Sequence, residues 1–239
     1  GQSQPPHYPL TDEQQHAIDC VNQASGNFQC FLLQGVTGSG KTQVFSELIR
    51  KTLERGAQVL LLVPEIGLTG QMVTRIQQQL TGTLAVSHSG LADGARAKAF
   101  VAASQGTADV LIGTRSALFT PMPNLGLILV DEEHDGAYKN QEGCRYSARD
   151  LAIVRAQQMR IPVVLSSATP SLESWHQAEF GKYIRLRLSS RPGQQPSPTI
   201  RLIDARHDKP KDGLSDASRR AIGDAIDRQQ QALVFLNRR

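Results

Sequence analysis

The chain contains few cysteines and few aromatic residues, and it has no long hydrophobic run. No apolar segment approaches the ~18–20 residues that span a bilayer, so we expect no membrane-spanning helix and no membrane partner. Its three cysteines, Cys20, Cys30 and Cys144, lie far apart and form no Cys-x-x-Cys pair. This argues against a disulfide framework or a zinc site and favours a cytoplasmic location. Residues 1–6 hold neither a basic nor an apolar region, so we expect no signal peptide.

Basic charge is concentrated in one stretch of the sequence. The 239 residues include 26 Lys and Arg against 22 Asp and Glu, a net charge of +4. Residues 139–191 alone hold nine Lys or Arg against four Asp or Glu, a net charge of +5. Such a stretch suits a polyanionic partner, although a solvated surface would have the same composition.

Short apolar runs alternate with helical patterns along most of the chain. We expect strands at 28–34, 57–63, 84–87, 109–112, 125–130 and 161–166. We expect helices at 12–23, 41–55, 69–80, 91–104 and 147–159, the first of them beginning with a capping box of Thr11 and Gln14. This alternation predicts an α/β domain with one doubly wound parallel sheet.

A proline-rich segment at 191–198 separates this region from the rest of the chain. We therefore expect a flexible segment at 1–9, an α/β domain at 10–190 and the start of a further domain at 199–239. Within that last part, the patterns favour a strand at 199–204, a helix at 215–230 and a strand at 232–236. Because the sequence stops directly after an apolar strand pattern, we expect it to be part of a longer protein.

A phosphate-binding pattern, G-x-x-x-x-G-K-[ST], lies between an expected strand and an expected helix. In such a loop, backbone N–H groups surround phosphate oxygens, and the helix N-terminus adds the positive end of its dipole. We expect Lys41 at the β- and γ-phosphates and the Thr42 hydroxyl at Mg²⁺. A flexible Gly-Ser turn is the alternative, but it does not explain the position between strand and helix. The matching residues are Gly35, Val36, Thr37, Gly38, Ser39, Gly40, Lys41 and Thr42.

An acidic cluster, Asp131-Glu132-Glu133-His134, directly follows the apolar run 125–130. A strand that ends in Asp places a carboxylate at the carboxyl edge of the sheet, where ligands of such sheets bind. Asp131 would hold Mg²⁺ through water, and Glu132 would orient or deprotonate the attacking water. Alone, such a cluster is often a solvated loop; together with the phosphate loop it favours a core that hydrolyses a nucleoside triphosphate.

Several segments resemble motifs of superfamily 2 helicases. Residues 131–134 form a DExH box, Ser167-Ala168-Thr169-Pro170 resembles motif III, and residues 10–17 resemble the segment whose glutamine reads adenine. With segments 64–69, 88–91, 113–117, 145–150 and 235–239, this ordered set is similar to that of the primosomal replication-restart helicases from about residue 9 onward.

The resemblance implies the first RecA-like lobe of an ATP-driven, Mg²⁺-dependent 3′-to-5′ DNA helicase that remodels stalled forks and initiates primosome assembly. It implies Lys41, Asp131, Glu132 and His134 as catalytic residues, Gln14 as the adenine contact, and Thr42 and Asp131 at the metal. The residues it implies for DNA binding or coupling are Pro64, Thr69, His88, Thr114, Arg115, Tyr138, Lys139, Arg145, Tyr146, Ser167 and Thr169. Simpler alternatives remain open at this stage: Arg115 in a surface ion pair, Thr69 as a helix cap, His134 as a loop histidine, Tyr146 in the core and Tyr138 at the surface.

The same resemblance implies partners and limits. It implies single-stranded and forked DNA, single-strand DNA-binding protein, other primosome proteins and a second helicase lobe as partners, and a nucleoid-associated location. Zinc is expected only in a C-terminal region beyond this chain. Since the arginine finger belongs to the second lobe, we expect the chain alone to bind nucleotide and DNA weakly, with little or no hydrolysis. The alternatives are a docking module without turnover and a nucleotide kinase, which offers no reason for residues 167–169.

Overall fold

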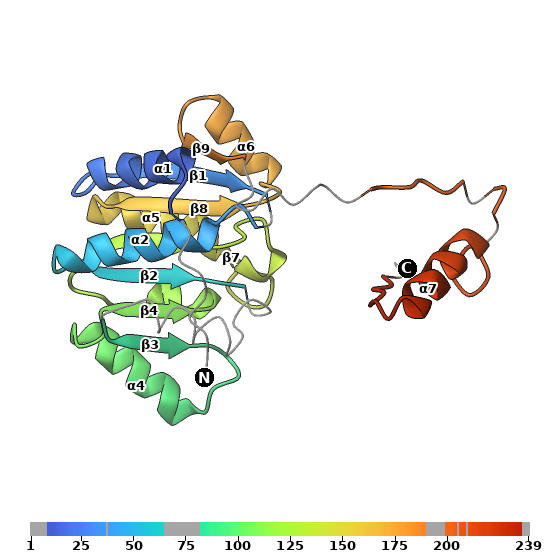
Figure 1. Cartoon of the computed structure of the whole chain (residues 1–239). Helices are drawn as coiled ribbons and strands as arrows, with labels where there is room; N and C mark the ends of the chain where they lie inside the picture. Colours follow the sequence, from blue (N-terminus) through green and yellow to red (C-terminus); the bar gives the residue numbers. More distant parts are fainter. Residues whose placement is uncertain are drawn as a thin grey trace. The chain divides into compact units, whose positions relative to one another are not determined.

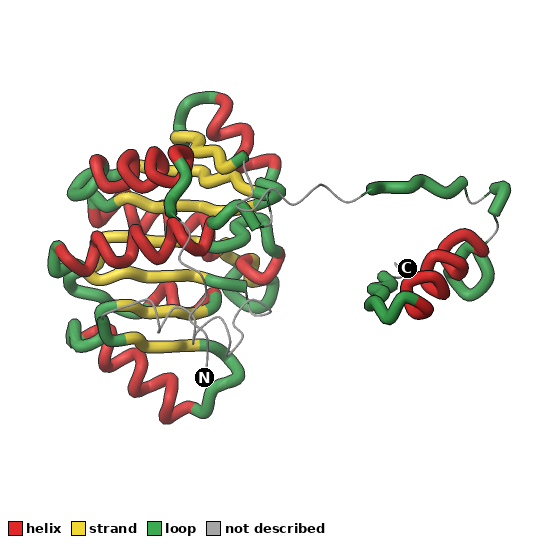
Figure 2. The backbone as a smooth tube through the Cα atoms, viewed as in Figure 1, coloured by secondary structure: helices red, strands yellow, loops and turns green. Residues whose placement is uncertain are grey.

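The computed structural model describes residues 9–36, 38–64, 82–189, 199–204, 206–208 and 210–235. The chain divides into two compact units, Gly1–Gln195 and Pro196–Arg239 (Figures 1 and 2). The helix expected at 69–80, together with Thr37 and Thr69, lies outside the described residues. Within the described ranges, no helix has the length and apolar character needed to cross a bilayer.

The larger unit is built on a seven-stranded sheet with the order β3-β4-β2-β5-β8-β1-β9. Every pair of neighbouring strands runs parallel, which confirms the predicted sheet. The strands are β1 (Gln29–Gly35), β2 (Gln58–Leu62), β3 (Leu84–Ser87), β4 (Val110–Gly113), β5 (Leu125–Val130), β8 (Pro162–Ser167) and β9 (Ile184–Leu188).

Helices cover both faces of this sheet, as Figure 1 shows for α1 and α2 on one side and α5 on the other. Successive residues of β1 therefore point to two different hydrophobic cores. Phe31 and Leu33 belong to the core under α1 and α2, whereas Cys30 and Leu32 belong to the core under α4 and α5. Burial on both faces explains why the strands read as continuous apolar runs. The helices are α1 (Asp12–Gln23), α2 (Lys41–Glu54), α4 (Asp93–Ser104), α5 (Ala148–Met159) and α6 (Leu172–Glu179).

Three strands end side by side at the carboxyl edge of the sheet. Leu165 of β8 pairs with Leu32 of β1 on one side and with Val130 of β5 on the other. The phosphate loop after β1, the acidic cluster after β5 and the motif III segment after β8 therefore meet at this edge.

Shorter elements follow these strands. A 3₁₀ helix, η2 (Arg115–Phe119), follows β4, and a second one, η3 (Gly136–Tyr138), follows the acidic cluster. A small antiparallel hairpin then joins β6 (Lys139–Asn140) to β7 (Tyr146–Ser147), directly before α5.

The smaller unit contains α7 (Asp216–Asp227), near the helix expected at 215–230. The predicted strands at 199–204 and 232–236 are wrong for the residues described there: neither 199–204 nor 231–235 forms a strand. An apolar run becomes a strand only when a neighbouring strand satisfies its backbone hydrogen bonds, and the described part of this unit has only an isolated bridge between Lys211 and Leu214.

Candidate nucleotide and DNA site

The phosphate loop combines left-handed glycines with a free helix N-terminus. Gly38 and Gly40 have φ angles of 82° and 86°, which glycine adopts without the steric cost of a Cβ. Gly40 is also the N-cap of α2, and no side chain caps this end of the helix. The first N–H groups of α2 are therefore available to an anion.

Two further observations fit a bound phosphate. A Cβ at Gly35 would lie 2.4 Å from Ser39 Oγ and 3.2 Å from Lys41 Cγ, so the loop closes tightly around this position. Ser39 Oγ is buried, and within the described residues it has no hydrogen-bond partner. A buried hydroxyl without a partner is rare in folded proteins, and a phosphate oxygen would supply one.

Lys41 lies between the phosphate loop and the acidic cluster. Its Nζ donates to Gly35 O at 3.0 Å and lies 3.4 Å from Glu132 Oε1. The lysine cation is thus already held at the carboxyl edge of the sheet, beside the expected catalytic carboxylate. A bound anion would share this cation with Glu132.

Asp131 provides an oriented carboxylate at the end of β5. Its Oδ1 accepts a hydrogen bond from Ser166 Oγ at 2.6 Å. Burial raises the pKa of Asp131, and the bond from Ser166 opposes that shift. The hard oxygens of Asp131 and the exposed Thr42 suit Mg²⁺, which typically takes one or two protein ligands beside phosphate. The described residues contain no group of three or more His, Cys, Asp or Glu that could hold a metal on their own.

Glu132 and His134 form a small polar group with motif III. Glu132 has a φ of 44°, a conformation that few residues other than glycine adopt. His134 Nδ1 lies 3.6 Å from Glu132 Oε2 and 2.7 Å from Ser167 Oγ, and that hydroxyl also accepts from Thr169 N–H at 2.9 Å. Motif III therefore contacts the acidic cluster directly.

Glu133 is turned away from this edge and is fully buried. Its carboxylate lies 3.1 Å from Arg149 Nη1 and accepts from Ser171 N–H at 2.7 Å and from Ser174 Oγ at 2.8 Å. No local sequence pattern indicated a separate role for Glu133. Only the opposite charge of Arg149, 16 residues later, could have suggested one.

Gln14, the adenine contact that the resemblance implied, lies beside the phosphate loop. The side chain is only 1% exposed, its Oε1 accepts from Thr11 N–H at 2.9 Å, and its Nε2 donates to Ser39 O at 3.0 Å. Gln14 thus contacts the phosphate loop through the backbone carbonyl of Ser39. Each end of the amide makes one hydrogen bond inside the protein, and the role of Gln14 as the adenine contact stays a prediction.

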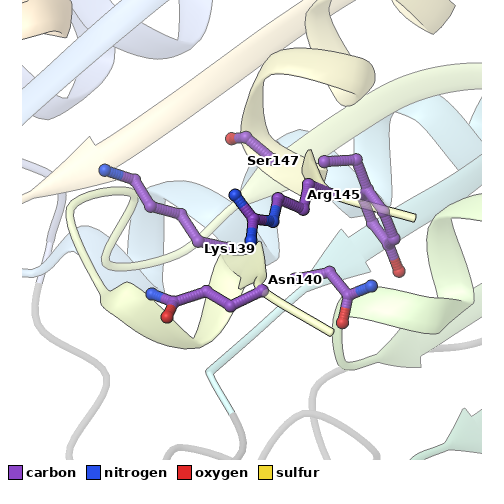
Figure 3. Close-up of a pocket in the computed structure, with 6 residues that line it drawn as sticks. Lys139, Asn140, Arg145 and Ser147 are labelled. Carbon is purple, nitrogen blue, oxygen red and sulfur yellow. The ribbon is translucent and has the colours of Figure 1, made fainter. Parts of the chain in front are cut away.

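The β6–β7 hairpin forms an open groove of about 470 Å³ lined by Lys139, Asn140, Gln141, Arg145, Tyr146 and Ser147. In Figure 3, Lys139 and Arg145 extend from the two sides of the hairpin. Two contacts fix the hairpin to η2: Arg115 donates to Lys139 O at 3.1 Å, and the Phe119 and Tyr146 rings meet edge to face at 5.2 Å. This groove joins cationic groups with an aromatic ring, a combination that suits unpaired bases and their phosphates.

The other residues implied for DNA binding divide by exposure. Lys139, Arg145 and Thr169 are exposed, and His88 and Arg115 are half-buried. Pro64 and Thr114 are buried, so their assignment to DNA binding or coupling stays a prediction. The Tyr138 ring is 1% exposed and its hydroxyl donates to Asp131 O at 2.6 Å, so it contacts the acidic cluster, and its assignment to DNA binding or coupling also stays a prediction. Of the simpler alternatives for the two tyrosines, the surface position of Tyr138 is wrong, whereas the half-buried Tyr146 both packs against the core and lines the groove.

Comparison with known proteins identifies the class. The family model for DEAD/DEAH box helicases matches residues 11–178, which include the phosphate loop, the acidic cluster and motif III. The chain therefore belongs to the DEAD/DEAH box helicase family. The structure of RecG bound to a three-way DNA junction matches with a TM-score of 0.60 at 25% identity, covering 80% of this chain and 25% of that one. The UvsW helicase of bacteriophage T4, at a TM-score of 0.53 and 17% identity over 79% of this chain and 62% of its own, shares the fold.

The particular relatives are replication restart proteins. Replication restart protein PriA of Haemophilus influenzae is 46% identical over 212 residues, which are 89% of this chain and 29% of that protein. PriA of Bacillus subtilis is 40% identical over 236 residues, 97% of this chain and again 29% of the relative. The resemblance to replication-restart helicases is confirmed, and the chain spans less than a third of the length of these relatives.

Proposed function

We propose that this chain is the first ATP-binding lobe of a PriA-like DNA helicase. The observation that carries the proposal is the meeting of three loops at one sheet edge. There, the uncapped N-terminus of α2 and Lys41, which can bind phosphates, lie beside the carboxylates of Asp131 and Glu132, which can bind Mg²⁺ and water.

In this proposal each group has a distinct task. The phosphate loop and Lys41 bind the phosphates, while Asp131 and Thr42 hold Mg²⁺, which would neutralise phosphate charge. Glu132 orients or deprotonates the attacking water, and its position beside Lys41 and His134 supports that role. His134 and Ser167 connect this site to motif III.

DNA binding is assigned to the groove of the hairpin. Lys139, Arg145 and Tyr146 would hold single-stranded DNA through phosphate and stacking contacts that carry no sequence information. His88, Arg115 and Thr169 are further candidate DNA contacts, and the buried Pro64, Thr114 and Tyr138 are candidates for coupling rather than for direct contact with DNA.

The complete protein would be a 3′-to-5′ helicase that acts on stalled forks and assembles a primosome. Residues 199–239 would begin its second lobe, and any zinc would lie in later segments. Single-strand DNA-binding protein and other primosome members are proposed as its partners. Because the arginine finger would come from the second lobe, the first lobe alone is expected to hydrolyse ATP slowly or not at all.

The test is a titration of the chain with a fluorescent ATP analogue and Mg²⁺. Lys41→Ala is expected to weaken binding more than tenfold, with little change in the melting temperature because Glu132 is partly exposed. Lys51→Ala is the matched control, since it removes a lysine of the same helix whose ion-pair partner is Asp19, at 3.6 Å, rather than a group of the proposed site. Equal binding by wild type and Lys41→Ala would contradict the assignment of the phosphate site.

A further inference from the structure

Glu133 is a buried carboxylate for which the proposed hydrolysis has no use. Its side chain is 0% exposed and Arg149 is 9% exposed, so this ion pair lies almost wholly out of water. Removing a carboxylate from water is costly unless several donors compensate it. Such a group, one residue from the proposed catalytic Glu132, calls for an explanation beyond packing.

The donors to Glu133 come from two different elements. Ser171 and Ser174 belong to the start of α6: Ser171 is its N-cap, and it donates through N–H to Oε1 and through its hydroxyl to Oε2 at 3.1 Å. Ser174 Oγ donates to Oε2 at 2.8 Å. Because a carboxylate is favoured at a helix N-terminus, this contact fixes the position of α6 relative to β5.

Motif III is consequently held at both ends by adjacent residues of the acidic cluster. His134 contacts Ser167 at its beginning, and Glu133 binds Ser171 just beyond its end. A shift of the acidic cluster on nucleotide binding would therefore move the whole segment 167–171 rather than one of its ends.

Arg149 adds the hairpin to this arrangement. It lies two residues after Ser147, the end of β7 and the N-cap of α5. Its Nη1 donates to Glu133 and to Ser171 Oγ at 2.8 Å, and its Nε donates to Asp150 at 2.7 Å. The guanidinium thus links the start of α5, directly after the proposed DNA groove, to Glu133 by one hydrogen bond and to Ser171, which itself binds Glu133, by another.

We propose that Glu133 is a positioning residue that, through Arg149 and Ser171, couples DNA binding at the β6–β7 hairpin to nucleotide binding at the DExH box. This inference rests on the proposed function, because it assumes that both ligands bind where that proposal puts them. It makes Glu133, a member of the acidic cluster, the common partner of Ser171, which follows motif III, and of Arg149, which follows the hairpin. Neither ligand touches Glu133 itself.

The test measures the linkage between the two ligands in the 239-residue chain. The affinity for fluorescein-labelled oligo(dT) is measured with and without a saturating, non-hydrolysable ATP analogue and Mg²⁺. Wild type is expected to show a change of about fivefold or more, in the range typical of coupled sites. Glu133→Gln keeps the shape of the side chain and removes its charge. In this variant the analogue is expected to change the DNA affinity by less than about twofold, while the affinity for each ligand alone stays within about threefold of the wild-type value.

Two variants separate positioning from general stability. Thr52→Val is the matched control: it removes a buried hydroxyl that donates to Leu48 O, at the far end of α2, and should leave the linkage intact. Arg149→Lys keeps the cation but not the forked geometry and is expected to retain part of the linkage. If Glu133 had only a structural role, Glu133→Gln would lower the melting temperature and weaken the binding of both ligands. The ratio of the DNA affinities measured with and without the ATP analogue would then stay at its wild-type value.

The outcomes distinguish this inference from the proposed function. If wild type fails to bind nucleotide or DNA, the proposed function of this chain is contradicted. If both bind but independently, or if Glu133→Gln keeps the wild-type linkage, the coupling role of Glu133 is overturned. Should Glu133→Gln fail to fold, Ser171→Ala decides: it removes the hydroxyl that lies between Arg149 and Glu133, and an unchanged linkage in that variant would overturn the proposal.

Discussion

At the scale of single residues, the narrowest point of the phosphate loop is Gly35. This residue ends β1 and pairs with Leu188 of β9, so the sheet holds it on one side. On the other side the loop folds back over Gly35, so that a Cβ added to this residue would lie only 2.4 Å from Ser39 Oγ. The first glycine of the pattern is thus required by close approach, whereas Gly38 and Gly40 are required by their positive φ angles.

Gly35→Ala is expected to weaken binding of the fluorescent ATP analogue at least tenfold and to destabilise the fold by about 1–3 kcal/mol, because the extra methyl group must displace Ser39 and Leu188. Urea unfolding and the same nucleotide titration measure the two effects. Gly94→Ala is the control, since a Cβ there meets nothing within 4 Å and lies in the first turn of α4. An ATP affinity equal to wild type in Gly35→Ala would show that the loop opens easily and that its tightness has no role.

At the scale of elements, the strands with both faces buried and the edge strand β3 were predicted from the sequence, whereas the other edge strand, β9, was missed. The parallel strands that flank the site read as apolar runs because helices cover them on both sides. By contrast, β9 alternates Arg185 and Arg187 with buried Leu186 and Leu188 at the sheet edge, and the eight-residue α6 is too short for a clear helical period.

The catalytic side of the site was predictable, and its supporting contacts were not. Lys41, Asp131 and Glu132 belong to local sequence patterns, so their roles could be inferred from spacing alone. The contacts of Glu133 with Arg149 and Ser174 join residues 16 and 41 positions apart. Such pairs depend on how α5 and α6 pack on the sheet, which no local pattern specifies. The same packing buried Tyr138 and left Tyr146 in the groove.

Arg155 is expected to contribute to stability through hydrogen bonds between α5 and η2 rather than through an ion pair. Arg155 of α5 donates to Leu118 O and to Thr120 O, the latter at 2.9 Å, and so closes the end of η2. Burial lowers the pKa of Arg155. Arg50 of α2, by comparison, pairs with two carboxylates, Glu47 and Glu54, but at the surface.

We expect Arg155→Ala to cost about 1–3 kcal/mol of unfolding free energy, because it leaves two carbonyls without their donor. Arg50→Ala should cost about 0.5 kcal/mol or less, since exposed ion pairs contribute little. Urea unfolding of both variants provides the comparison, with nucleotide binding as a check that the phosphate loop is intact. A larger loss for Arg50→Ala would mean that surface charge outweighs the carbonyl contacts of η2.

At the scale of the whole molecule, burial is distributed very unevenly between the two units. All the buried hydrophobic side chains of the described residues belong to the larger unit, whereas α7 has no buried residue. In the smaller unit, Leu202 is 96% and Leu233 98% exposed, and Phe235 is exposed as well. Because apolar burial is the main source of folding free energy, the larger unit should carry nearly all the stability of the chain.

Deleting residues 196–239 tests this distribution of stability. The melting temperature of the remaining chain is expected to stay within about 2 °C of that of the full chain, because a loss of ~1 kcal/mol would shift it by about that much or more in a domain of this size. The deletion should also leave nucleotide binding unchanged, since every group assigned to the phosphates lies before residue 135. Amide hydrogen exchange in the full chain supplies an independent measure: protection is expected across β1, β5 and β8 and little of it in α7, whose residues bury nothing. A fall of more than about 5 °C, or strong protection of α7, would show that the smaller unit contributes to the fold in a way that its exposed side chains do not indicate.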